Sequence, residues 1–169
     1  MENPTNILLW FSAISVGIMA GVYYTFSAFV MRSLDAIEAP SGMLAMQSIN
    51  RVIVRSSFLP IFFGSTLACA VLAVIAVLNL SAPGAIWTLV GSILYVMGMF
   101  VVTVAGNVPL NNQLEATKAD SPDGPEMWAL YMRKWIVWNH VRTIACIAST
   151  VMLIFAIGER IQIASDATP

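Results

Sequence analysis

Charge is the property that this sequence lacks most. Of its 169 residues only 10% are Asp, Glu, Lys or Arg, whereas 59% are hydrophobic. A soluble domain carries about a quarter charged residues, so a soluble fold is excluded and an integral membrane protein is predicted. The net charge is −1 and the basic residues are scattered. No basic stripe can therefore follow a phosphate backbone, and we expect no nucleic-acid partner.

Side chains that bind metals or carry redox chemistry are equally scarce. Cys69 and Cys146 lie inside apolar runs and form no Cys-x-x-Cys pair, as expected of small buried hydrophobic residues. His140 is the only histidine, and no carboxylate lies in the inner half of a predicted helix. We therefore predict no metal site and no cofactor. Haem with two axial histidines is excluded within one chain, but ten methionines leave a His/Met pair open.

Long runs without charge predict the membrane-crossing helices. No charged residue lies between Asn3 and Met31, or between Ser56 and Leu114. About 20 apolar residues cross a membrane, so the second run crosses twice, with a turn at 79–84. The first run is far longer than the apolar part of a signal peptide, and we expect a retained helix. The predicted membrane helices are about 6–34, 58–80, 85–112 and 128–160.

Between the first two helices, about 43–55 has apolar residues along one side and polar residues along another, which predicts a short interfacial helix. Pro109 should kink or end the third helix, and the tail 161–169 should be frayed. The predicted fold is all-α, a four-transmembrane-helix up-down bundle forming a single domain over 1–169.

The basic residues predict the orientation of the bundle. Loops 35–57 and 113–127, with the residues beside them, hold most of the Lys and Arg; the opposite side has only Arg160. The positive-inside rule then places these loops in the cytoplasm, with both termini outside the plasma (inner) membrane.

This orientation brings polar residues of four segments into one leaflet, where ionisable groups are functional candidates. The fourth helix contributes Trp135, Trp138, Asn139, His140 and Arg142. The other candidates are Tyr23, Tyr24, Gln47, Asn50, Arg51, Asn107 and Asn111. Each has a plainer explanation: tyrosines in an interfacial belt, asparagines at a helix end, a snorkelling arginine, or a satisfied buried histidine.

Four motifs carry a family resemblance: Tyr-Tyr-Thr-Phe-Ser-Ala-Phe from Tyr23, Met-Gln-Ser-Ile-Asn-Arg from Met46, Asn-Val-Pro-Leu-Asn-Asn from Asn107, and Trp-Asn-His-Val-Arg from Trp138. Together they resemble the small membrane-protein family that includes the anthrone oxygenases, over about residues 8–158. The resemblance implies oxidation of polyketide anthrones to anthraquinones.

That reaction needs a base, a stabiliser for an enolate oxygen and an apolar slot, because the anthrone anion reduces O₂ directly. Histidine ordinarily titrates near neutral pH, so His140 is the predicted base. Arg142 is the predicted charge stabiliser, aided by Asn139, Asn107 or Asn111. Trp135, Trp138 and Tyr24 would sandwich the aromatic rings.

The sequence also allows non-enzymatic functions. The same pocket could hold a lipid, quinone or haem in a binding protein or a transport accessory protein, or the chain could be a purely structural oligomer. The predicted partners are a small apolar molecule and the lipid bilayer, and a homo-oligomer is left open.

Overall fold

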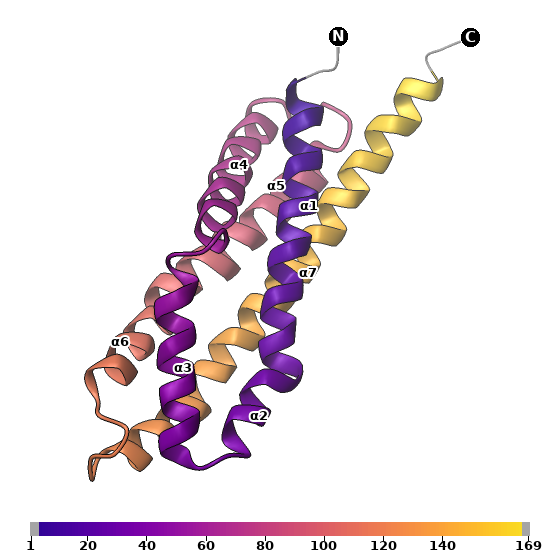
Figure 1. Ribbon diagram of the computed structural model, residues 1–169. Coiled ribbons are helices and arrows are strands. Elements are labelled where there is room, and N and C mark those ends of the chain that lie inside the picture. The colour runs from indigo at the N-terminus through magenta and orange to yellow at the C-terminus, as the bar shows by residue number, and fades with distance from the viewer. Residues whose placement is uncertain (1–3, 167–169) are drawn as a thin grey trace.

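The computed structural model describes residues 4–166, which form helices and turns without a strand. Four helical spans within this range are long and apolar enough to cross a membrane: Pro4–Asp35, Phe58–Leu78, Ala85–Ala116 and Gly124–Ile163. They run up and down along one bundle, with Pro4 and Asp166 at the same end (Figure 1). The predicted all-α bundle is confirmed, and the chain is an integral membrane protein.

The first span contains a local widening that the sequence did not predict. It consists of α1 (Pro4–Thr25), the π-helical segment η1 (Phe26–Val30) and α2 (Met31–Asp35). In a π-turn each backbone bond spans five residues instead of four, so the turn holds an extra residue. The predicted helix 6–34 is therefore present but is not a regular α-helix throughout.

The short helix between the first two spans is α3 (Ala39–Ile53), which starts earlier than predicted because Pro40 fits its first turn. It runs beside α2 and leads into α4 (Phe58–Leu78), along the bundle and not across its end (Figure 1). Met43 and Met46 are buried against protein. The amphipathic pattern of this expected interfacial helix thus serves packing inside the bundle.

The third span continues past the residue that was expected to kink or end it. It comprises α5 (Ala85–Tyr95), η2 (Val96–Val101), η3 (Thr103–Asn107) and α6 (Val108–Ala116). Pro109 sits in the first turn of α6, directly after the π-helical turns. Its missing N–H is tolerated there, so the helix goes on to Ala116.

The fourth span, α7, extends over Gly124–Asp166 and is longer than the predicted 128–160. Residues 161–166, expected to be frayed, belong to the helix, while the rest of that tail, 167–169, lies outside the described residues. Because α3, α6 and α7 extend into the expected loops 35–57 and 113–127, the connections shrink to short turns, 36–38 and 117–123 among them.

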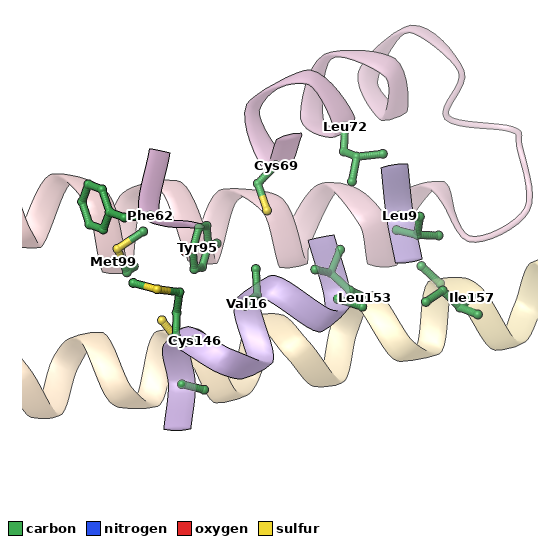
Figure 2. Close-up of a cluster of buried hydrophobic side chains, with 14 of the residues drawn as sticks. Leu9, Val16, Phe62, Cys69, Leu72, Tyr95, Met99, Cys146, Leu153 and Ile157 are labelled. Atoms are coloured by element: carbon green, nitrogen blue, oxygen red, sulfur yellow. The ribbon is translucent and has the colours of Figure 1, made fainter. Parts of the chain in front are cut away.

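Two apolar clusters hold the bundle together. One joins α1, α4, α5–η2 and α7, and Figure 2 shows side chains such as Val16, Tyr95, Met99 and Leu153 meeting between these elements. The other lies around α2, α3, α6 and the start of α7 and includes Trp135. The candidate site described next takes residues from both clusters.

Candidate functional site

A cavity of about 260 Å³ lies where the two clusters meet. Its walls come from both halves of the chain, α1–η1 through α4 and η2 through α7. Most of the lining is apolar, and its aromatic and polar residues include Tyr23, Phe26, Asn50, Phe58, Phe62, Thr103, Asn111, Trp135, Asn139 and Arg142.

Arg142 is the charged group of this cavity, and it is only 5% exposed. Its Nη2 donates to Asn139 Oδ1 at 2.8 Å and its Nη1 to Thr103 Oγ1 at 3.4 Å, while its Nε has no partner. The guanidinium carbon lies 4.3 Å from the centre of the Tyr23 ring and 5.2 Å from that of Trp135. A buried cation is thus held by neutral groups and aromatic faces, with no carboxylate beside it.

Asn139 fixes the orientation of that guanidinium. Its side chain is fully buried. The amide Nδ2 donates to the Tyr23 carbonyl oxygen at 2.9 Å and to Ser27 Oγ at 2.7 Å, which leaves Oδ1 to accept from Arg142. With both donors and the acceptor assigned, the amide has one orientation. The Arg142 head group is therefore preorganised before any ligand arrives.

All three π-helical segments of the described chain border the cavity. Phe26 comes from η1, Phe100 from η2, and Thr103 with Val104 from η3. π-Helix accounts for well under 1% of residues in proteins and is concentrated at functional sites. Three such segments around one buried arginine mark this region as the candidate site.

Two asparagines add further donors. Asn111 Oδ1 accepts from the Tyr131 hydroxyl and from Trp135 Nε1, each at 2.8 Å, so its amide NH₂ is left for a ligand. Asn50 also lines the cavity, and its buried Nδ2 has no partner. The free polar groups are thus mainly hydrogen-bond donors around one positive charge. They suit a ligand whose oxygens accept hydrogen bonds or carry negative charge.

Half of the residues proposed from the sequence share this cavity: Tyr23, Asn50, Asn111, Trp135, Asn139 and Arg142. Those on α7 do so because 135, 139 and 142 follow the helical spacing and share one face. The neighbouring His140 is rotated by about 100° from Asn139 and points away from the cavity. Its ring is exposed, and its Nδ1 lies 2.9 Å from Ser27 Oγ.

Two aromatic candidates also lie outside the cavity. Tyr24 is 59% exposed and Trp138 is 42% exposed, so neither can sandwich a ligand there. The Trp138 ring instead covers Gly106, where an added Cβ would lie 2.8 Å from it. This contact explains why a glycine stands in η3.

Three polar candidates serve the structure instead. Gln47 is buried and donates to the carbonyl oxygens of Leu114 and Thr117, which ties α3 to the end of α6. Arg51 forms an exposed ion pair with Glu115 at 2.8 Å. Asn107 donates to the Trp135 carbonyl oxygen at 3.2 Å and does not line the cavity.

Several lining residues were not predicted from the sequence. Phe58 and Phe62 stack with ring centres 5.8 Å apart and form an aromatic wall. Their i, i+4 spacing was visible, but it is equally typical of a buried helix face. Ser27 does not line the cavity but accepts a hydrogen bond from Asn139; it belongs to the motif that begins at Tyr23 but was not among the proposed site residues.

Among the described residues, no group of three His, Cys, Asp or Glu side chains is placed to hold a metal ion.

Comparison with known families gives one match. A family model described as anthrone oxygenase matches residues 57–152, more than half of the chain. No curated protein and no solved structure matches the chain. The matched segment contains Thr103, Asn111, Asn139 and Arg142. It thus contains four of the polar residues that line the cavity, while Tyr23 and Asn50 lie outside it.

Proposed function

The chain belongs to the anthrone oxygenase family, and we propose that it is a membrane-embedded oxygenase that oxidises an anthrone-type aromatic ketone with O₂ and without a cofactor. The observation that carries this proposal is the buried Arg142, which lies without a carboxylate partner in an apolar cavity lined by hydrogen-bond donors. Such a charge is costly to bury, and a ligand oxygen that becomes negative would complete its coordination.

The walls of the cavity suit a flat aromatic ring system. Phe58 and Phe62 stack on one side, and Trp135 lies on another. Aromatic rings favour offset stacking and edge contacts, and a tricyclic ketone offers large faces for both. Its oxygens would accept hydrogen bonds from Arg142 and Asn111. A saturated lipid chain would use the apolar walls but would leave these donors without partners.

The proposed chemistry begins with loss of one methylene proton to a water molecule that reaches the cavity from the polar, Arg55 edge of the bundle, which leaves the anthrone as its enolate. Arg142 holds the enolate oxygen, and the low dielectric around it strengthens this interaction. The electron-rich carbon then forms a C–O bond with O₂, and the resulting peroxide anion takes up a proton. Loss of the second methylene hydrogen together with hydroxide gives the ketone and water. In balance, CH₂ and O₂ become C=O and H₂O.

His140 as the base stays a prediction from the sequence. Its ring lies outside the cavity, with Ser27 as its hydrogen-bonded neighbour. The mechanism proposed here uses water as the proton acceptor, and Arg142 supplies the driving force by stabilising the anion. With water as the proton acceptor, a substitution at Arg142 should abolish O₂ uptake, whereas a substitution at His140 should not.

Oxygen uptake tests the proposal. Protein reconstituted in lipid nanodiscs should consume O₂ when 1,8-dihydroxyanthrone is added, with one O₂ used for each quinone formed. Arg142→Gln should lose this activity, and Gly21→Ala serves as a control because nothing lies within 4 Å of its added Cβ. A wild-type protein that binds the compound but consumes no O₂ would instead be a quinone-binding protein, since the same donors suit a quinone.

We also propose a location for the protein. The side of the bundle with the short connections 36–38 and 117–123 carries most of the basic residues, which supports a cytoplasmic position for that side. The membrane would then be the plasma (inner) membrane, with both ends of the chain outside. The cavity would lie in the cytoplasmic half of the bilayer.

A further inference from the structure

The cavity has a polar end and an apolar end. At the polar end, Asn139 and Arg142 are buried. Four of the lining residues are exposed, and all four are apolar: Val54, Phe63, Val104 and Val108. Phe63 and Val104 are 55% and 52% exposed. The cavity therefore reaches the protein surface through a ring of hydrophobic side chains.

We name the surface formed by these four residues the lateral mouth. Val54 lies at the α3–α4 junction, Phe63 on α4, Val104 on η3 and Val108 on α6. Phe63 lies edge-on to Phe100 of η2 at 6.4 Å between ring centres, which closes the opening on one side. The segment from Ser56 to Leu114 contains no charge and forms two membrane spans. Phe63, Val104 and Val108 belong to these spans and face hydrocarbon, whereas Val54, beside Arg55, marks the polar edge of the mouth.

A shallow apolar hollow outside η1 and α3 shares three residues with the cavity, Phe26, Ile49 and Ile53. The three are only partly exposed, and the Phe26 ring packs against Trp135 with 5.8 Å between centres. These three side chains stand between the hollow and the cavity, and the residues of the lateral mouth are more exposed than they are.

We propose that the ligand enters through the lateral mouth from the bilayer as a neutral flat aromatic ketone, with its oxygens leading toward Arg142. The identity of this ligand rests on the proposed function. Once the ketone oxygen reaches Arg142, the methylene carbon on the opposite edge of an anthrone faces the mouth. O₂ is apolar and favours hydrocarbon over water, so it arrives from the same side. The polar and apolar ends of the cavity thus direct O₂ to the carbon that it attacks.

This orientation determines specificity. Apolar substituents on the edge remote from the ketone would extend through the mouth into lipid and be tolerated. A charged substituent on that edge would have to remain in hydrocarbon, which is costly. The site should therefore select aromatic ketones whose oxygens gather on one edge.

Blocking the mouth tests the proposal. Val104→Trp places a large ring at the opening. Leu67→Trp places the same ring on the exposed side of α4, one helical turn beyond Phe63, and Leu67 does not line the cavity. The probe is 1,8-dihydroxyanthraquinone, followed by its absorbance in stopped-flow mixing with nanodisc-embedded protein. We expect Val104→Trp to slow association and dissociation about tenfold each, with nearly the same Kd, and Leu67→Trp to match the wild type.

A second variant is needed because the new Trp ring in Val104→Trp could enter the cavity and block binding directly. Phe63→Ala widens the mouth and should raise both rate constants. Unchanged rate constants in both Val104→Trp and Phe63→Ala would overturn the proposal, and so would slowing by Ser48→Trp, which blocks the outer hollow instead. If Val104→Trp slows probe binding but the wild-type protein consumes no O₂, the route of entry is supported and the proposed function is contradicted. If the wild type consumes O₂ but the variants leave the rate constants unchanged, the proposed function is supported and the route of entry is contradicted.

Discussion

At the scale of single residues, the buried Arg142 guanidinium lowers the stability of the fold but is available to bind a ligand oxygen. Removing a guanidinium from water costs several kcal/mol even after relaxation. Two hydrogen bonds and the faces of Tyr23 and Trp135 offset part of that cost, and a cation–π contact contributes about 0.5–2 kcal/mol. A binding site retained at the expense of stability is a common compromise in functional sites.

Replacing this charge should therefore separate binding from stability. We expect Arg142→Met to bind 1,8-dihydroxyanthraquinone at least about tenfold more weakly, since a hydrogen bond to a charged group contributes about 1.5–3 kcal/mol. Its thermal unfolding temperature in detergent should stay the same or rise, because an apolar side chain replaces a buried charge. Arg142→Lys keeps the charge without the planar fork and should bind with intermediate affinity. A folded Met variant with wild-type affinity would contradict this account of Arg142.

The two neighbours Asn139 and His140 provide a matched pair of variants. Asn139→Ala removes the acceptor that orients Arg142 and should lower turnover about tenfold or more. His140→Ala changes an exposed side chain outside the cavity and should keep turnover within about threefold of the wild type. Oxygen uptake measures both. If His140→Ala is folded but inactive, His140 regains its predicted role as the base.

At the scale of elements, regular helical periodicity could be predicted and irregular turns could not. Trp135, Asn139 and Arg142 were predicted site residues; the α-helical spacing puts them on one face of α7, and all three line the cavity. Thr103, Asn107 and Asn111 of the third span follow the same four-residue spacing. Thr103 and Asn111 line the cavity, but Asn107 donates to the backbone of α7.

The reason for this difference lies in the π-turns. Residue preferences do not distinguish an α-turn from a π-turn, and each extra residue rotates the following side chains around the helix axis. η3 immediately precedes α6, so the face of the third span changes where Asn107 stands. The contact of Ser27 with Asn139 likewise depends on η1. Such contacts arise from tertiary packing, which a single sequence does not reveal.

The π-helical segment η2 also depends on a close approach to α7, which gives an element-scale prediction. A Cβ added at Gly98 would collide with the Cβ of Ala145, and neither backbone can yield easily. We expect Gly98→Ala to destabilise the protein by about 1–3 kcal/mol, seen as a lower unfolding temperature. Gly21→Ala meets nothing within 4 Å and gains helix propensity, so it should be neutral or slightly stabilising. Equal stability of the two variants would contradict the packing described here.

At the scale of the whole molecule, composition alone predicted four membrane spans and their up-down order. Absence of charge over long runs determines which segments can cross a bilayer, and this depends little on tertiary detail. The exact ends of the helices were harder to predict. Helices α6 and α7 extend into the expected loop 113–127. The last turn of a helix forms and frays easily, so the sequence does not determine at which residue the helix ends.

The orientation in the membrane can be tested by chemical labelling. Ser81→Cys lies at the α4–α5 turn and Asp120→Cys at the opposite end of the bundle, and both positions are exposed. The native Cys69 and Cys146 are buried and should not react in the folded protein. In intact cells a membrane-impermeable maleimide should label Ser81→Cys, and it should label Asp120→Cys only after permeabilisation. The opposite labelling pattern would invert the proposed orientation.

The spectrum of bound 1,8-dihydroxyanthrone without oxygen tests the central claim most directly. The neutral ketone and its anion absorb at different wavelengths, so the ionisation state of the bound compound can be read while no oxidation takes place. At neutral pH the wild-type protein should bind it as the anion, and Arg142→Gln should bind it, more weakly, as the neutral ketone. A compound that stays neutral in the wild-type cavity, or that ionises equally in the Arg142→Gln variant, would contradict the role assigned to Arg142.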